Sequence, residues 1–126
     1  MDQDRYRIVL CGASAYDKKY YFNNKFDKLP ENIKEELHII CVLFTEEVGG
    51  VFTISFTPLG KVELDAQKDE GDLLYDDIGA ELLKKEIRRK KADMLRALSI
   101  YYKVTFLKQD MAALLEADDE EEEEDD

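Results

Sequence analysis

Strict alternation of apolar and polar residues predicts a β-hairpin in the middle of the chain. Over residues 52–57, Phe and Ile alternate with Thr and Ser, and over residues 61–66, Val, Leu and Ala alternate with Lys, Glu and Asp. A period of two gives each strand one buried face and one solvent-exposed face. Pro58 suits the first central position of the connecting turn, and Gly60 tolerates a positive φ.

Two shorter segments before this hairpin predict further strands. Residues 5–11 alternate apolar side chains, and the aromatic segment 19–23 follows a turn of small residues at 12–15. Aromatic and β-branched residues favour strands. Together with the hairpin, these segments predict a sheet of about four strands.

A helical period replaces the alternation after residue 30. Apolar residues recur at spacings of four, three and four, at Ile33, Leu37, Ile40 and Phe44. Pro30 suits the first turn of this helix, and Gly49 with Gly50 ends it. Further apolar residues in the second half predict that the helix is largely buried. The β-branched segment 38–44 would also suit a strand.

A heptad pattern predicts one long amphipathic helix from residue 76 to residue 107. Apolar residues recur every seven positions at Ala80, Ile87, Met94 and Tyr101. Because residues 84–93 are otherwise almost entirely polar, such a helix projects into solvent or pairs with a second copy of itself. The predicted dimer seam consists of Ile87, Met94 and Tyr101. Residues 101–107 would also suit a closing strand.

These elements predict an α+β fold: an antiparallel sheet of about four strands, one buried helix and one long C-terminal amphipathic helix. The length suits a single domain, which we place at residues 5–110. A flexible N-terminus at residues 1–4 precedes it. Residues 111–126 form an acidic tail whose composition predicts disorder.

The net charge of −12 comes largely from that tail, because residues 116–126 hold ten of the 30 acids and no base. The remaining 20 acids nearly balance the 18 bases, so the domain itself is close to neutral. The acidity argues against broad binding to nucleic acid or anionic membranes. The longest apolar run, residues 39–44, is too short to span a membrane. With no signal peptide and only two cysteines, a cytoplasmic protein with reduced thiols is expected.

The strongest surface feature is a basic stretch within the predicted long helix. Six of the eight residues from 84 to 91 are positively charged, which can bind phosphates. The ordinary alternative is a solvated helix face, and the acidic tail could compete with nucleic acid for the stretch. The candidate nucleic-acid-binding residues are Lys84, Lys85, Arg88, Arg89, Lys90, Lys91 and Arg96.

An acidic loop supplies the oxygen ligands that a hard cation such as calcium would need. Its carboxylates are Asp69, Glu70, Asp72, Asp76 and Asp77. Their spacing departs from an EF-hand loop, and Asp76 and Asp77 can instead stabilise the start of a helix. The single histidine, His38, lies three residues before Cys41, but two ligands fall short of the four that zinc prefers.

Catalytic chemistry is thinly supplied, and no motif indicates a cofactor. An enzyme would need a pocket, and its only plausible polar contributors are Tyr16, Tyr20, Cys11, His38 and the acids of residues 69–77. The sequence therefore leaves the function unknown. It favours a small non-enzymatic binding or regulatory module, homodimeric through residues 78–106 or bound to an unidentified protein. A nucleic-acid-associated protein is the alternative, and an enzyme of unidentified type is the second alternative.

Several blocks of sequence are distinctive together: LCGASAY at 10–16 with KYYF at 19–22, LP at 29–30 with IKEEL at 33–37, CVLFTEEVGG at 41–50, and DEGDLLYD at 69–76. With these blocks, residues 6–108 resemble an uncharacterised family of small cytoplasmic proteins from anaerobic, gut-dwelling Clostridium-type bacteria. The resemblance implies no activity, cofactor or catalytic residue. The helix–hairpin–helix order of residues 31–107 is also similar to small dimeric scaffold domains of the roadblock type, an analogy of fold that carries no function.

Overall fold

Pairs of short strands alternate with helices along the chain. The computed structural model describes residues 7–109 and residue 112. In chain order the elements are β1 (Ile8–Ser14), β2 (Lys19–Phe22), the 3-10 helix η2 (Asn24–Phe26), α1 (Glu31–Val48), β3 (Val51–Phe56), β4 (Val62–Gln67), α2 (Asp77–Lys90) and α3 (Ala92–Thr105). The predicted α+β fold with a four-stranded antiparallel sheet is confirmed. The predicted N-terminus 1–4 and, apart from residue 112, the predicted tail 111–126 lie outside the described residues.

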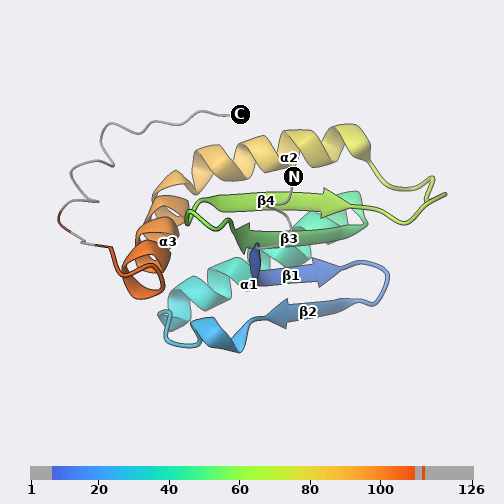
Figure 1. The fold of residues 1–126 in the computed structure, drawn as a ribbon. Helices are drawn as coiled ribbons and strands as arrows, with labels where there is room; N and C mark the ends of the chain where they lie inside the picture. Colours follow the sequence, from blue (N-terminus) through green and yellow to red (C-terminus); the bar gives the residue numbers. More distant parts are fainter. Residues whose placement is uncertain (1–6, 110–111, 113–126) are drawn as a thin grey trace.

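Every strand of the sheet is antiparallel to its neighbours, in the order β2-β1-β3-β4. Cys11 of β1 pairs with Phe22 of β2 and with Ile54 of β3, and Ile54 pairs with Leu64 of β4. Paired residues point to the same face of a sheet, so these four side chains make one face apolar. Thr53, the neighbour of Ile54 in β3, points to the opposite face. In Figure 1, α1 lies behind β1 and β3 and α2 runs beside β4, so the helices cover the apolar face.

Residues 38–44, which the sequence predicted as either helix or strand, lie inside α1, which is continuous from Glu31 to Val48. Its inner face carries the predicted residues Leu37, Ile40 and Phe44, all buried. Its outer face is less buried than predicted, because Ile39 and Leu43 are 57% and 55% exposed. The helix covers only one face of one sheet, so its opposite side stays in solvent.

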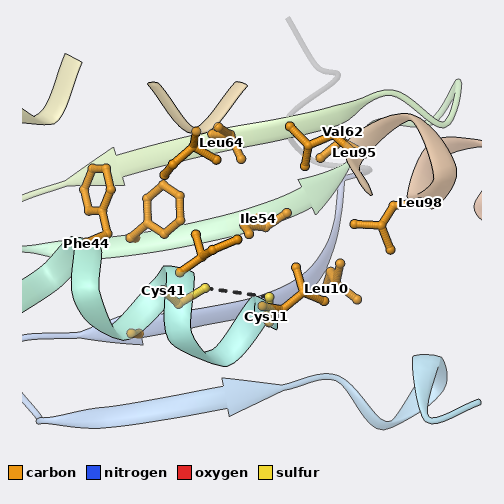
Figure 2. Close-up of a cluster of buried hydrophobic side chains, with 14 of the residues drawn as sticks. Leu10, Cys11, Cys41, Phe44, Ile54, Val62, Leu64, Leu95 and Leu98 are labelled. Carbon is orange, nitrogen blue, oxygen red and sulfur yellow. Dashed lines mark hydrogen bonds between the residues drawn. The ribbon is translucent and has the colours of Figure 1, made fainter. Parts of the chain in front are cut away.

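Side chains from the sheet and from all three α-helices form one apolar core. Figure 2 shows Leu10, Ile54, Val62 and Leu64 from the strands meeting Phe44 of α1 and residues of α3. Aromatic rings extend this core toward α3, since Tyr102 stacks on Phe56 with ring centroids 4.4 Å apart. The burial of these side chains is what holds the helices against the sheet.

The prediction of one long C-terminal helix is wrong, because the chain breaks the helix at Lys91. The backbone of Lys91 has φ −110° and ψ 25°, outside the α-helical region, and α3 then leaves the direction of α2 (Figure 1). The bend lets Leu95, Leu98 and Tyr102 of α3 reach the core. The alternative of a closing strand at 101–107 is also wrong, since α3 continues to Thr105. None of the described helices is long and apolar enough to cross a membrane.

Candidate functional site

The basic stretch of α2 is largely neutralised by contacts within the chain. Lys84 pairs with Glu81 at 3.1 Å, Lys90 with Glu86 at 2.8 Å, Lys91 with Glu36 and Arg96 with Asp93 at 3.2 Å. The Arg88 guanidinium donates to the backbone oxygen of Val62 at 3.2 Å. Among the described residues, only Lys85 and Arg89 of the seven predicted candidates have no such partner. These two lie four residues apart on the exposed side of α2.

The five carboxylates of the acidic loop do not converge on a common point. Asp76 accepts a hydrogen bond from the Gly79 N–H at 2.8 Å and so caps α2, and Asp77 pairs with Lys68 at 3.5 Å. Asp72 accepts from the Tyr16 hydroxyl at 2.5 Å. Within residues 7–109 and residue 112, no group of three or more His, Cys, Asp or Glu side chains could hold a metal ion. The geometry therefore gives the predicted calcium or magnesium site no support.

The Tyr16–Asp72 contact instead ties the acidic loop to the end of β1. The same hydroxyl accepts from the Asp69 N–H at 2.9 Å. The hydrogen bond from Tyr16 holds the pKa of Asp72 below its usual value, because it stabilises the charged form. We expect Tyr16→Phe to raise the pKa of Asp72 toward that of a free carboxyl. Carboxyl carbon NMR titration measures this, and an unchanged midpoint would show that the contact does not persist in solution.

The predicted dimer seam is turned toward the core of its own chain. Ile87 is buried, while Met94 and Tyr101 are partly buried against the same core. Because the helix bends at Lys91, the heptad positions do not form one straight row. The structure therefore does not present Ile87, Met94 and Tyr101 as a continuous exposed surface.

A second set of apolar residues is exposed on the outer side of the helical layer. Ile39 and Leu43 of α1 are 57% and 55% exposed, and Ile78 and Leu82 of α2 are 75% and 62% exposed. The two helices run antiparallel beside each other: the Asp76 N–H donates to Val48 O at 3.1 Å at one end, and Lys91 pairs with Glu36 at the other. We call this the two-helix surface; its members are Ile39, Leu43, Ile78, Leu82, Lys85 and Arg89.

A pocket of about 430 Å³ opens between the β1–β2 hairpin and α1. Its aromatic wall consists of Tyr20 and His38, whose rings stack with centroids 4.1 Å apart. The apolar part of the lining is Ala13, Ala15 and Val42, and the polar part is Ser14, Lys18, Lys19, Thr45 and Glu46. Of the residues that the sequence singled out for an enzyme, Tyr20 and His38 therefore meet here. Tyr16 and the acidic loop do not line the pocket.

Two thiols lie in the core close to Tyr20. The Sγ atoms of Cys11 and Cys41 are 3.7 Å apart and point toward one another from β1 and α1 (Figure 2). Both residues are fully buried. Their mutual hydrogen bond and burial raise the pKa of Cys41 far above its usual range, and burial likewise raises the pKa of the Tyr20 hydroxyl. Because the thiolate is the reactive form, Cys41 is not suited to act as a nucleophile, and Cys11 is buried away from any substrate.

We therefore expect both cysteines to resist thiol reagents in the folded protein. Ellman's reagent added to native protein should release almost no chromophore within minutes. In guanidinium chloride the same sample should release two equivalents, the full cysteine content. Fast release of one equivalent from native protein would contradict the burial of the two thiols.

Sequence reasoning missed the pocket because its walls come from segments far apart in the chain. Tyr20 and His38 were each named, but no spacing connects β2 with the third turn of α1. Nothing in the sequence places Lys18, Lys19, Val42 or Thr45 beside these two rings. The one available signal was an aromatic edge strand before an amphipathic helix, which is common to many folds.

Comparisons with known proteins identify a family and nothing further. A family model described as a family of unknown function (DUF6145) matches residues 7–110. No curated protein and no solved structure matches the chain significantly. The match confirms the expectation of a family of unknown function.

Proposed function

The chain belongs to this family of unknown function, DUF6145, and we propose that it is a small non-enzymatic binding module that forms a homodimer through the two-helix surface. The observation that supports the proposal is the exposure of four large apolar side chains on two adjacent helices. Scattered exposed apolar residues are ordinary, but a contiguous apolar area marks an interaction site. This surface replaces the seam that the heptad pattern predicted.

The charges beside these apolar residues complement each other between the two helices. The outer side of α1 carries exposed Glu35, whereas the outer side of α2 carries exposed Lys85 and Arg89. A two-fold axis parallel to the helices would set α1 of one protomer over α2 of its partner. The start of α1 lies beside the end of α2, so Glu35 would then come near Arg89 and Leu43 near Leu82 of the second copy. Such pairing covers apolar area and matches opposite charges.

The compartment and origin are part of the same proposal. Two sulfur atoms 3.7 Å apart and unbonded suit a reducing compartment, so we propose a cytoplasmic protein. The bacterial origin implied by the sequence resemblance stays a proposal as well. Nucleic-acid binding has less support, because most of the predicted phosphate contacts are occupied by carboxylates of the same chain. The pocket alone, without a reactive thiol, does not favour an enzyme.

Replacing one apolar residue of the two-helix surface tests the dimer. Leu82→Asp places a charge where the proposed interface is apolar, so the variant should be a monomer at concentrations where the wild type is a dimer. Light scattering after size exclusion distinguishes the 14.7 kDa chain from twice that mass. Leu59→Asp is the matched control, because Leu59 is 73% exposed in the β3–β4 turn, outside the surface. A wild type that stays monomeric at high micromolar concentration would refute the proposal.

A further inference from the structure

We infer that an acidic, extended peptide segment of a partner protein binds as a fifth strand along β2, in the groove between β2 and α1. Within residues 7–109 and residue 112, the strand β2 is an edge of the sheet, since β1 is the only strand there that pairs with it. This inference goes beyond the dimer, because the groove lies on the β2 side of α1 and the two-helix surface lies on the outer side of α1 and α2. Adding a strand to an exposed sheet edge is a general mode of peptide recognition.

The backbone of β2 has hydrogen-bonding groups directed away from the sheet. The Asn23 N–H donates to the Leu10 oxygen of β1 at 2.9 Å. In an antiparallel pair, alternate residues direct their N–H and C=O to the same neighbour. Tyr21 and Lys19 therefore face β1, whereas Tyr20 and Phe22 direct their backbone groups to the free edge. These two residues offer the two donors and two acceptors that an added strand requires.

The pocket lies where a side chain of the added strand would point. Tyr20 shares the apolar face of the sheet with its pair Ala13, and the pocket between them and α1 has about 430 Å³. Successive side chains of a strand alternate between faces, so every second residue of the peptide would point toward α1. The stacked rings of Tyr20 and His38 and the side chain of Val42 suit an apolar or aromatic residue at this position. Glu46 on the α1 wall disfavours an acid inside the pocket.

The charges at the two ends of β2 select acids in the rest of the peptide. Lys18 and Lys19 lie at its start, and Lys25 and Lys28 follow its end. All four are exposed, and none forms an ion pair with another residue of the described part of the chain. Opposite charge on the peptide would speed association and fix its position. The expected ligand therefore has acids flanking one apolar or aromatic residue.

Selection from a random displayed peptide library on the full chain tests the inference. Enriched peptides should contain acids around a central apolar residue, and their affinity, measured by fluorescence anisotropy, should fall with salt. Val42→Trp fills the pocket and should weaken binding at least tenfold, whereas Leu59→Trp should not change it. Lys18→Glu with Lys19→Glu should also weaken binding, which keeps the test valid if the Val42 variant does not fold.

Backbone methylation distinguishes strand addition from binding by side chains alone. Two versions of the selected peptide are compared, one with N-methyl groups at its odd positions and one with them at its even positions. One version should lose binding and the other should bind nearly as before, since only every second amide faces β2. Equal binding of both versions, binding that Val42→Trp and the lysine variants leave intact, or no enrichment would overturn the inference. Displacement of the selected peptide by a synthetic peptide of residues 110–126 would also overturn it, because the occupant would then be a segment of this chain.

Discussion

Phe56→Ala should lower the free energy of unfolding by about 4 kcal/mol, as expected for removal of a fully buried Phe from a core. Phe56 is 0% exposed, stacks on Tyr102 with centroids 4.4 Å apart and lies 5.4 Å from the ring of Phe26. It therefore links β3 to α3 and to η2. Alanine would leave a cavity that three separate elements cannot easily close.

Urea unfolding followed by circular dichroism measures this loss as a lower midpoint at an unchanged slope. Leu59→Ala is the control, because a side chain 73% exposed should change stability by no more than about 0.5 kcal/mol. A loss below about 1 kcal/mol for Phe56→Ala would mean that α3 does not pack on the sheet as described.

Gly50→Ala should be the most damaging glycine substitution, at roughly 3 kcal/mol or more. Gly50 has φ +71°, which disfavours any other residue, and a Cβ there would overlap the Gln67 backbone oxygen and lie 2.7 Å from the Tyr75 ring. The Gln67 oxygen cannot move away without disturbing the pairing of β3 with β4, because Gln67 pairs with Val51 in that ladder.

Gly71→Ala separates the cost of the positive φ from the cost of the steric overlap. Gly71 has a similar φ of +85°, but a methyl group on its Cα would meet nothing within 4 Å, so its substitution should cost only the conformational penalty of about 1–2 kcal/mol. Thermal or urea unfolding of both variants gives the comparison. If Gly50→Ala were no worse than Gly71→Ala, the close approach at Gly50 would not exist in solution.

Local patterns were sufficient for β3, β4 and α1, because these elements have a clear period of two or 3.6 and glycines next to them. The turn predicted at residues 12–15 is wrong for residues 12–14, because β1 continues to Ser14 and pairs there with both β2 and β3. The same reasoning failed at Lys91. No glycine or proline marks this break, and both halves have high helix propensity. The bend arises because Leu95, Leu98 and Tyr102 gain burial only if α3 leaves the line of α2, which depends on the position of Phe56 in a different element.

The candidate sites were harder to predict than the fold for a related reason. A run of like charge is visible in the sequence, but the partners that neutralise it are not. Glu36 and Val62 come from α1 and β4, and only packing brings them to Lys91 and Arg88. Likewise, the groove beside β2 exists because α1 returns next to the edge strand, with His38 stacked on Tyr20.

A charge exchange measured by sedimentation equilibrium tests the proposed dimer most directly. The wild type should sediment as a dimer, and Arg89→Glu should weaken the dimer roughly tenfold by opposing Glu35 of the second copy. Adding Glu35→Arg to the same chain should restore it, because each protomer then presents the exchanged pair to the other. A double variant that is no more dimeric than Arg89→Glu alone, or a monomeric wild type, would contradict the account.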